Sequence, residues 1–409
     1  MKITVMKFGG TSVADPEKIQ RAAERAIAER RKGYGVVVVV SAPGEMTDEL
    51  ITLAERITPS PDDRELDQLI TTGEQVGISL FAMACKARGA DAVSLTGPQA
   101  GIVAKGGAAR AQIDVIRTAN IRRHLKAGRI VAVAGFQGAE NGDVVTLGRG
   151  GSDLTAVALA SALKTGRCEI FSDVKGVYTA DPRIVHEARK LKTITFEEML
   201  ELAGAGAQVM MARSMEVAER FGVRIHVRSA FHPQGGTWVV AKEKSMLEKA
   251  FVSSLALDKS EVRLTVVGVP DQPGVAAKVL TALAAENVPV DMIIQSAPAQ
   301  TGVNDISFMS PKSSALKAKK ALESVARSLR AERVDLNEEV AKVSAVGTGF
   351  RRSPRIAATM FSALAAQKIN IHMISASDLR VSCVVDLAQG ENALKALHKA
   401  YGLAKGRRA

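Results

Sequence analysis

The sequence has few cysteines, few aromatic residues and no long hydrophobic run. Its three cysteines, Cys85, Cys168 and Cys383, are far apart and odd in number, which argues against a disulfide framework and a metal-binding cluster. We expect buried, reduced thiols in a cytoplasmic protein and no metal site formed by side chains. No segment approaches the roughly 18 apolar residues that a membrane span needs. Lys2 and Lys7 interrupt the first apolar segment, so no signal peptide is predicted.

Aromatic residues make up only 4% of the chain, which bears on its net charge of +12. From Pro311 to Ala409 the chain has 18 Lys and Arg against 8 Asp and Glu. These cations are dispersed over predicted helix faces and a basic tail, with no interleaved aromatic residues on which bases could stack. The pattern favours a solvated basic face and predicts no nucleic-acid partner.

Common catalytic and phosphate-binding motifs are also missing. The chain has no Walker A sequence, no G-x-G-x-x-G and no Ser/His/Asp or Cys/His constellation. Instead, Lys7-Phe8-Gly9-Gly10 joins a predicted strand, residues 2–8, to a helix predicted to end near Arg31. Two residues without Cβ atoms let backbone N–H groups approach an anion, and Lys7 adds a positive charge. The pattern indicates a phosphate cradle, although an ordinary β–α corner has the same elements.

At 409 residues the chain exceeds the roughly 250 to 300 residues of one hydrophobic core, so two or three domains are expected. Strands and helices alternate through the first 240 residues, which predicts an α/β fold with a parallel-rich sheet between helices. Ligands of such sheets bind beyond the carboxyl ends of the strands.

Polar segments follow the predicted strands. After the strand 36–41, Thr47 is either a helix N-cap or a substrate contact. Glu74 stands beside a predicted helix break at Gly73, where it could bind an ammonium group or lie on the surface. After the strand 168–172, Asp173 could orient a metal–nucleotide complex, and Tyr178 could line a base or ribose pocket.

The most informative segment follows the strand 130–134. It contains Gly135-Phe136-Gln137-Gly138, a polar hairpin at Asn141-Gly142, and Leu147-Gly148-Arg149-Gly150-Gly151-Ser152-Asp153 before a helix. Helix N-terminal amides and an arginine that can grip a carboxylate bidentately predict a second anion site. Two anion sites beyond strand ends suggest phosphoryl transfer from a nucleotide to a small anionic acceptor.

Together with Thr71-Thr72-Gly73-Glu74 and Gly176–Arg183, these motifs resemble the aspartate kinase family, which has the amino-acid kinase fold. The resemblance implies that ATP phosphorylates the side-chain carboxylate of L-aspartate, giving 4-phospho-L-aspartate for lysine, threonine, methionine and diaminopimelate biosynthesis. It implies Mg²⁺ carried with ATP, and three sets of residues. The catalytic set is Lys7, Arg149 and Asp153; the substrate set is Thr47, Glu74, Arg149, Gly150, Gly151 and Ser152; the ATP set is Lys7, Phe8, Gly9, Gly10, Ser41, Ser172, Asp173, Tyr178 and Arg183.

Some positions depart from the family pattern. Pro43 replaces a usual methionine, Met46 and Leu154 replace usual threonines, and the familiar His-Pro-Arg is Met211-Ala212-Arg213. The charged residues of the motifs are intact.

The last third contains an internal repeat. Residues 273–296 align with 354–377 at a constant offset, with ten identities in 24 positions. The repeated strand–helix–strand order resembles paired ACT domains, although two βαβ units can be similar by coincidence. We therefore expect a kinase domain at 1–245, a linker and first ACT domain at 246–340, and a second ACT domain with the basic tail at 341–409.

The ACT resemblance implies an amino-acid effector, threonine or lysine, and a homo-oligomer. Its site would contain residues of the first copy and, from a partner chain, two of the second: Asp271, Gly274, Ala276, Gln295, Asn370 and Ile371. In the second copy Arg355 replaces the matching glycine and His372 a usual acidic residue, so we expect lysine binding there to be weakened. A separately made regulatory subunit could start near Met246.

Two alternatives stay open. One is another amino-acid kinase with a glutamate-type substrate, and the other is an amino-acid sensor with an inactive kinase half. The presence of Lys7, Glu74, Arg149 and Asp153 argues against an inactive half.

Overall fold

The structure, a computed structural model, describes residues 1–109, 111–148, 150–207, 210–233, 235–242, 251–296 and 302–404. The chain divides into two compact units. The first comprises Met1–Val177, Lys190–Ala203 and Gln208–Ser245, and the second comprises Tyr178–Arg189, Gly204–Ala207 and Met246–Ala409. All three cysteines are free and buried, as predicted. Among the described residues, no helix has the length and apolar character that crossing a membrane requires.

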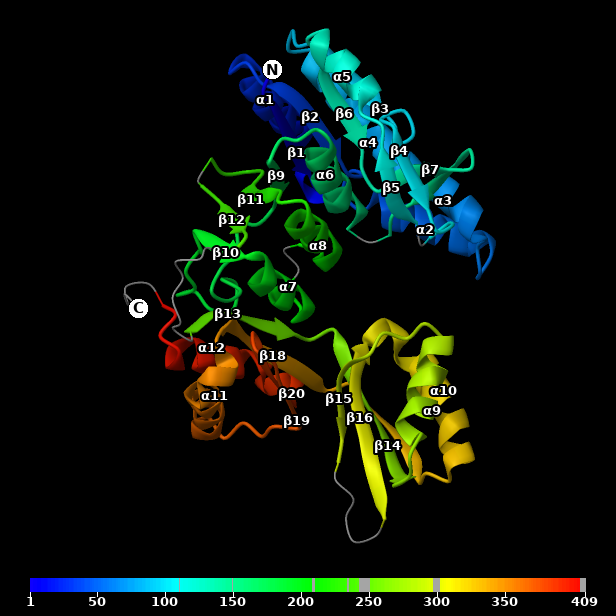
Figure 1. The fold of residues 1–409 in the computed structure, drawn as a ribbon, viewed down its shortest axis with the longest axis vertical. Coiled ribbons are helices and arrows are strands. Elements are labelled where there is room, and N and C mark those ends of the chain that lie inside the picture. The colour runs from blue at the N-terminus through cyan, green and yellow to red at the C-terminus, as the bar shows by residue number, and fades with distance from the viewer. Residues whose placement is uncertain are drawn as a thin grey trace. The chain divides into compact units, whose positions relative to one another are not determined.

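An eight-stranded sheet forms the centre of the first unit (Figure 1). Its order is β10-β12-β11-β9-β1-β2-β6-β3, and every neighbouring pair is parallel except β11 and β12. The strands are β1 (Ile3–Phe8), β2 (Gly35–Val40), β3 (Ala92–Leu95), β6 (Ile130–Ala134), β9 (Arg167–Ser172), β10 (Thr193–Thr195), β11 (Arg224–Ser229) and β12 (Thr237–Val240). The predicted parallel-rich sheet is confirmed.

Helices cover both faces of this sheet, because its central strands are apolar on both sides. Val36, Val38 and Val40 of β2 belong to a core cluster with α1 and α4. Val37 and Val39 are also fully buried, and α6 contacts β2 without contributing to that cluster. The helices are α1 (Pro16–Arg31), α2 (Met46–Ile57), α3 (Asp63–Ile70), α4 (Thr72–Lys86), α5 (Ala119–Lys126), α6 (Gly151–Ala162), α7 (Phe196–Gly204), α8 (Ala212–Arg220) and the 3-10 helix η1 (Gly10–Val13).

A second, small sheet has the order β5-β4-β7-β8. It contains β4 (Ile102–Lys105), β5 (Gln112–Ile116), β7 (Gln137–Glu140) and β8 (Asp143–Thr146). Asn141 and Gly142, with φ of 51° and 96°, form the predicted hairpin between β7 and β8. The hairpin of β4 and β5 was not predicted, because β5 is largely exposed and lacks an alternating apolar pattern.

The second unit contains two four-stranded antiparallel sheets, one for each repeat. The first repeat has the order β15-β16-β14-β17 and the second has β13-β18-β20-β19. The first repeat comprises β14 (Glu261–Pro270), α9 (Val275–Ala285), β15 (Asp291–Gln295), β16 (Val303–Pro311), η2 (Lys312–Ser314), α10 (Ala315–Leu329) and β17 (Arg333–Asn337). The second comprises β13 (Phe251–Asp258), β18 (Val340–Thr348), η3 (Phe350–Arg352), α11 (Pro354–Ala366), β19 (Met373–Ala376), β20 (Arg380–Asp386), η4 (Leu387–Gln389) and α12 (Gly390–Ala400).

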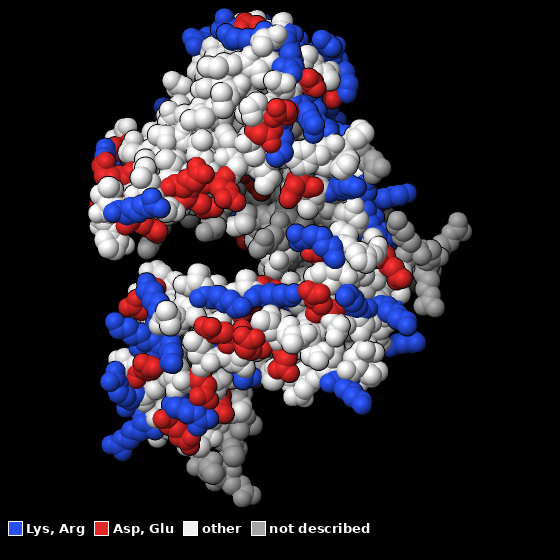
Figure 2. Space-filling view, turned by 180° about the vertical axis from the view of Figure 1, so that it is seen from behind, with Lys and Arg blue, Asp and Glu red and all other residues white. Residues whose placement is uncertain are grey.

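Two segments of the second unit belong to the second repeat although they precede the first repeat in sequence. Strand β13 precedes the first repeat but pairs with β18 of the second. Residues 178–189 add Ala180, Val185 and Ala188 to the core of the second repeat. The predicted domain limits therefore stay a prediction. On one face of this unit, Lys and Arg side chains are interspersed with Asp and Glu (Figure 2), as expected of a solvated surface.

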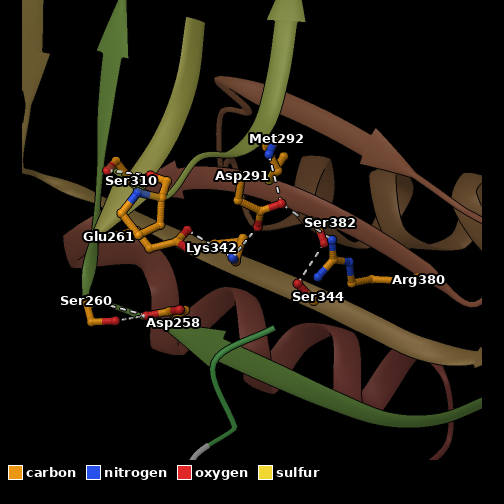
Figure 3. A network of polar contacts seen from close by, with 11 residues as sticks. Asp258, Ser260, Glu261, Asp291, Met292, Ser310, Lys342, Ser344, Arg380 and Ser382 are labelled. Carbon is orange, nitrogen blue, oxygen red and sulfur yellow. Dashed lines mark hydrogen bonds and ion pairs between the residues drawn. The ribbon is translucent and has the colours of Figure 1, made fainter. Parts of the chain in front are cut away.

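A buried ion network connects the two repeats (Figure 3). The side chain of Lys342 on β18 is fully buried, and its Nζ lies 2.9 Å from Glu261 Oε2 and 2.8 Å from Asp291 Oδ2. Both carboxylates come from the first repeat, and Arg380 Nη2 lies 3.7 Å from Asp291 Oδ1. An apolar cluster that includes Met292 of the first repeat and residues of the second also spans this junction.

Candidate active site

The lysine of the glycine turn meets the acidic end of the arginine motif. Lys7 is the penultimate residue of β1, and Asp153 lies in the first turn of α6. Lys7 Nζ is 2.6 Å from Asp153 Oδ1, and the two side chains are only 13% and 11% exposed. Two motifs that are distant in sequence thus share one poorly solvated ion pair.

The two glycines after β1, Gly9 and Gly10, suit their positions for different structural reasons. A Cβ atom on Gly10 would lie 2.8 Å from the Ala42 carbonyl oxygen, so this glycine allows η1 to pack on the loop after β2. Gly44 N–H donates to the Gly10 carbonyl at 3.1 Å in the same contact. A Cβ on Gly9 would lie 3.4 Å from Lys7 Nζ. Gly9 therefore keeps the space beside the ammonium group free, which suits an incoming phosphate.

Glu74 is a buried carboxylate with an unused oxygen. It is 3% exposed, so the surface alternative is wrong, and Ala42 N–H donates to its Oε1 at 3.2 Å. Its Oε2 is buried and has no hydrogen-bond partner within the described part of the chain. Burial raises the pKa of Glu74 to about 7. An ammonium group would satisfy this oxygen and favour the ionised carboxylate.

The helix break expected near Gly73 lies at Thr71, between α3 and α4, and Gly73 is in the first turn of α4. One expectation for the neighbouring helix needs correction. The N-cap of α2 is Glu45, and Thr47 is the second residue of that helix. The capping alternative for Thr47 is therefore wrong, and a substrate contact stays a prediction.

The start of α6 is shaped by close packing. Gly150 is its N-cap, with a φ of 71°. A Cβ on Gly151 would lie 2.8 Å from the Phe136 ring, and one on Gly135 would lie 2.6 Å from Ser152 Oγ. The two glycine motifs thus pack directly against each other. Arg149, the predicted carboxylate ligand, lies outside the described residues.

The remaining predicted ATP ligands fall into two groups. Ser41 follows β2, and Ser172 ends β9, where its Oγ donates to Asp173 Oδ1 at 2.8 Å. These residues lie at the carboxyl edge of strands that flank β1. The Phe8 side chain is fully buried and stacks on Phe171, so only the Phe8 backbone can face a ligand.

Tyr178 and Arg183 belong to the second unit. Tyr178 packs against the core of the second repeat, and Arg183 Nη2 lies 2.7 Å from Asp181 Oδ2. Their role at ATP stays a prediction. In the described residues, no group of three His, Cys, Asp or Glu side chains could hold a metal ion.

The predicted effector loop has an open glycine corner. Gly274 is the N-cap of α9 with a φ of 92°, and nothing lies within 4 Å of the place where its Cβ would be. Asn304, which the sequence analysis missed, is 2% exposed and donates through Nδ2 to Asp271 Oδ1 at 2.9 Å. Ala276 lies in α9, Gln295 ends β15, and Asn370 and Ile371 precede β19.

The corresponding corner of the second repeat is different. Its helix α11 begins at Pro354, so Arg355 lies inside the first turn. His372 Nε2 lies 2.7 Å from Asp386 Oδ1. The glycine corner of the first repeat is thus absent from the matching described residues of the second.

Family comparisons agree with both units. The amino acid kinase family matches residues 2–229, and the ACT domain matches residues 264–325 and 343–401. The chain therefore belongs to the amino acid kinase family and carries two ACT domains, which confirms the predicted fold class.

Full-length relatives narrow this class. The chain is 44% identical over 407 residues to the aspartokinase of Mycobacterium tuberculosis, covering 98% of this chain and 97% of that protein. It is 46% identical over 404 residues to the aspartate kinase of Pseudomonas putida, covering 98% of each. The crystal structure of E. coli aspartokinase III with aspartate and ADP has a TM-score of 0.81 and 27% identity, covering 97% of this chain and 99% of that one. These relatives place the chain among the aspartokinases.

Proposed function

We propose that this chain transfers the terminal phosphoryl group of ATP to the side-chain carboxylate of L-aspartate, the first step toward lysine, threonine, methionine and diaminopimelate. The observation that carries this proposal is the Lys7–Asp153 ion pair beside Gly9, where a Cβ atom would contact the Lys7 ammonium group at 3.4 Å and partly cover it. The unused Glu74 oxygen adds a place for the substrate ammonium group. The E. coli relative, which is crystallised with aspartate and ADP, supports the same pair of ligands.

The charge of each residue indicates its role in the proposed reaction. Lys7 would hold the transferring phosphoryl group and neutralise its developing charge, with Gly9 and Gly10 supplying backbone donors. Arg149 would grip a substrate carboxylate, and Glu74 would hold the ammonium group. Mg²⁺ carried with ATP supplies charge neutralisation across the phosphates, and Asp173 would face it. The substrate carboxylate is already a nucleophile, so no side-chain base is needed.

A hydroxamate assay with MgATP tests the activity and separates it from a glutamate-type kinase. We expect acyl phosphate from aspartate and little from glutamate. An Arg149→Ala variant should lower kcat/KM for aspartate by about 100-fold, because a bidentate carboxylate contact is lost. Equal rates with glutamate, or no product from either amino acid, would refute the proposal.

The raised pKa of Glu74 predicts a pH dependence of substrate use. The ionised carboxylate binds ammonium, so kcat/KM for aspartate should rise as pH increases through about 7 and then level off. A Glu74→Gln variant should have a low kcat/KM without this inflection. Initial rates between pH 5.5 and 8.5 measure it, and an inflection that survives in Glu74→Gln contradicts the assignment.

The same pKa shift affects stability with a defined sign. Since the pKa of Glu74 is raised in the folded chain, its stabilising contribution is complete below the ordinary pKa of glutamate and is lost as pH rises through about 7. Above that pH, a bound substrate ammonium group would stabilise the ionised Glu74 carboxylate.

Threonine is the proposed effector of the first ACT domain, and lysine should act weakly at the second. The open Gly274 corner supports the first part, and Arg355 in the matching helical turn supports the second. Titration of activity with threonine and lysine, singly and together, should show inhibition that requires threonine. Strong inhibition by lysine alone would contradict this.

We also propose how the chain assembles and where it acts. We infer a cytoplasmic homo-oligomer that pairs through its ACT domains, supported by three buried free thiols and by the ACT matches. An alternative start at Met246 lies outside the described residues.

A further inference from the structure

We propose that Asp67 and Arg213 are positioning residues that fix the loop carrying Arg149. The inference rests on the proposed function, and it assigns a task to two residues outside the aspartate and ATP sets. From different helices, both hydrogen-bond to the same two places in the chain, one marked by Ala109 and Ala111 and the other by Thr146 and Leu147.

Asp67 on α3 holds this pair through its carboxylate. It is 1% exposed and accepts three hydrogen bonds. Thr146 donates to it through N–H at 2.8 Å and through Oγ1 at 2.7 Å, and Ala109 N–H donates at 3.0 Å. A carboxylate this deeply buried costs free energy unless donors satisfy it, so its three bonds hold Thr146 firmly.

Arg213 near the start of α8 holds the adjacent positions. Its Nη1 donates to the Leu147 carbonyl at 2.7 Å, and its Nη2 donates to the Ala111 carbonyl at 3.1 Å. The planar guanidinium bridges two carbonyls that a lysine ammonium on its flexible stem could not hold in one fixed geometry. Leu147 N–H also donates to the Phe136 carbonyl at 2.8 Å, and the Leu147 side chain is fully buried.

The need for such an anchor comes from the residues that follow. Gly148 and Gly150 both have positive φ, at 74° and 71°, and they flank Arg149. Glycine allows many backbone conformations, so Gly148 and Gly150 add little to the fixed geometry that the bonds at Thr146 and Leu147 provide. Met211 packs closely against Gly150, because a Cβ atom on Gly150 would lie 2.0 Å from Met211 Cγ. Because Thr146 and Leu147 are held in place before the substrate binds, less conformational entropy is lost when the arginine that follows them binds a carboxylate.

The experiment measures KM and kcat for aspartate and for MgATP separately. In Arg213→Ala we expect kcat/KM for aspartate to fall on the order of 100-fold, as a displacement of about 1 Å can cause, with KM for MgATP nearly unchanged. Guanidinium ion at millimolar concentration should restore part of the aspartate activity, and Arg213→Lys should be intermediate. Arg220→Ala, on the exposed end of the same helix, is the control and should match the parent.

A second variant keeps the test independent of folding. Thr146→Val removes only the Oγ1 bond to Asp67 and should raise KM for aspartate about tenfold, whereas Thr146→Ser should not. If both substrates are affected equally, or if Arg213→Ala and Thr146→Val retain the parent kcat/KM, the positioning role is wrong. A parent enzyme that fails to phosphorylate aspartate would instead overturn the proposed function.

Discussion

Replacing Lys7 with methionine is expected to lower kcat for aspartate phosphorylation about 1000-fold, or ~4 kcal/mol of transition-state stabilisation. The ammonium group lies beside Gly9, and the Lys7 side chain is only 13% exposed, so water cannot replace its charge efficiently. Its effect should be greatest when negative charge develops on the transferring group. Steady-state ADP release, measured at saturating MgATP and aspartate, reports this kcat.

The loss of Lys7 also leaves Asp153 without its ion-pair partner, which could disturb the fold. Lys7→Met/Asp153→Asn removes that stray charge, so it should regain stability and remain inactive. Lys2→Met, on an exposed residue before the same strand, is the matched control and should keep the parent rate. A Lys7→Met enzyme within tenfold of the parent kcat contradicts the role assigned to Lys7.

The meeting of Lys7 and Asp153 could be expected from sequence because it follows from topology. Both residues lie near the carboxyl edge of parallel strands, where polar side chains from distant segments converge. Short continuous apolar runs also predicted β2 and β6 closely, and the Asp15-Pro16 pair predicted the start of α1, which Asp15 caps. The internal repeat likewise predicted two similar modules, which are the two four-stranded sheets of the second unit.

Features that depend on distant packing could not be predicted. Asp67 belongs to a helix that reads as amphipathic and largely polar, and only the tertiary fold shows that its carboxylate is buried. Tyr178 follows the first-unit strand in sequence, but its ring packs in the core of the second repeat. Strand β13 likewise pairs beyond the intervening repeat, which no local pattern records.

Replacing Lys342 with methionine is expected to destabilise the second unit by about 3 kcal/mol, because the poorly solvated Glu261 loses the Lys342 ammonium group and the half-buried Asp291 keeps only the longer ion-pair contact with Arg380. Lys342 Nζ contacts Glu261 and Asp291, and its own side chain is fully buried. Burial lowers the pKa of Lys342, but the charges of Glu261 and Asp291 outweigh it and raise the pKa overall. Burial raises the pKa of Asp291, but Lys342 and Arg380 lower it by more, so the pKa is lowered overall.

These shifts fix the pH range of the effect. The contribution of Lys342 is lost only when pH rises through its raised pKa, and that of Asp291 only when pH falls through its lowered pKa. Burial raises the pKa of Glu261, so protonation of Glu261 sets the acidic limit, and the expected loss is greatest when pH lies above that pKa and below the pKa of Lys342. Hydrogen exchange of the β18 amides in the full chain measures it. Trp238, the one tryptophan, lies in the first unit and reports that unit separately by fluorescence.

Two further variants separate the buried network from ordinary surface charge. Lys259→Met removes an exposed partner of Glu391 and should leave stability nearly unchanged, as is usual for surface ion pairs. Adding Glu261→Gln and Asp291→Asn to Lys342→Met should restore most of the protection of β18, because no buried charge is then left without a partner. If Lys342→Met alone leaves β18 as protected as Lys259→Met does, the network contributes little, and the apolar cluster around Met292 must hold the repeats together.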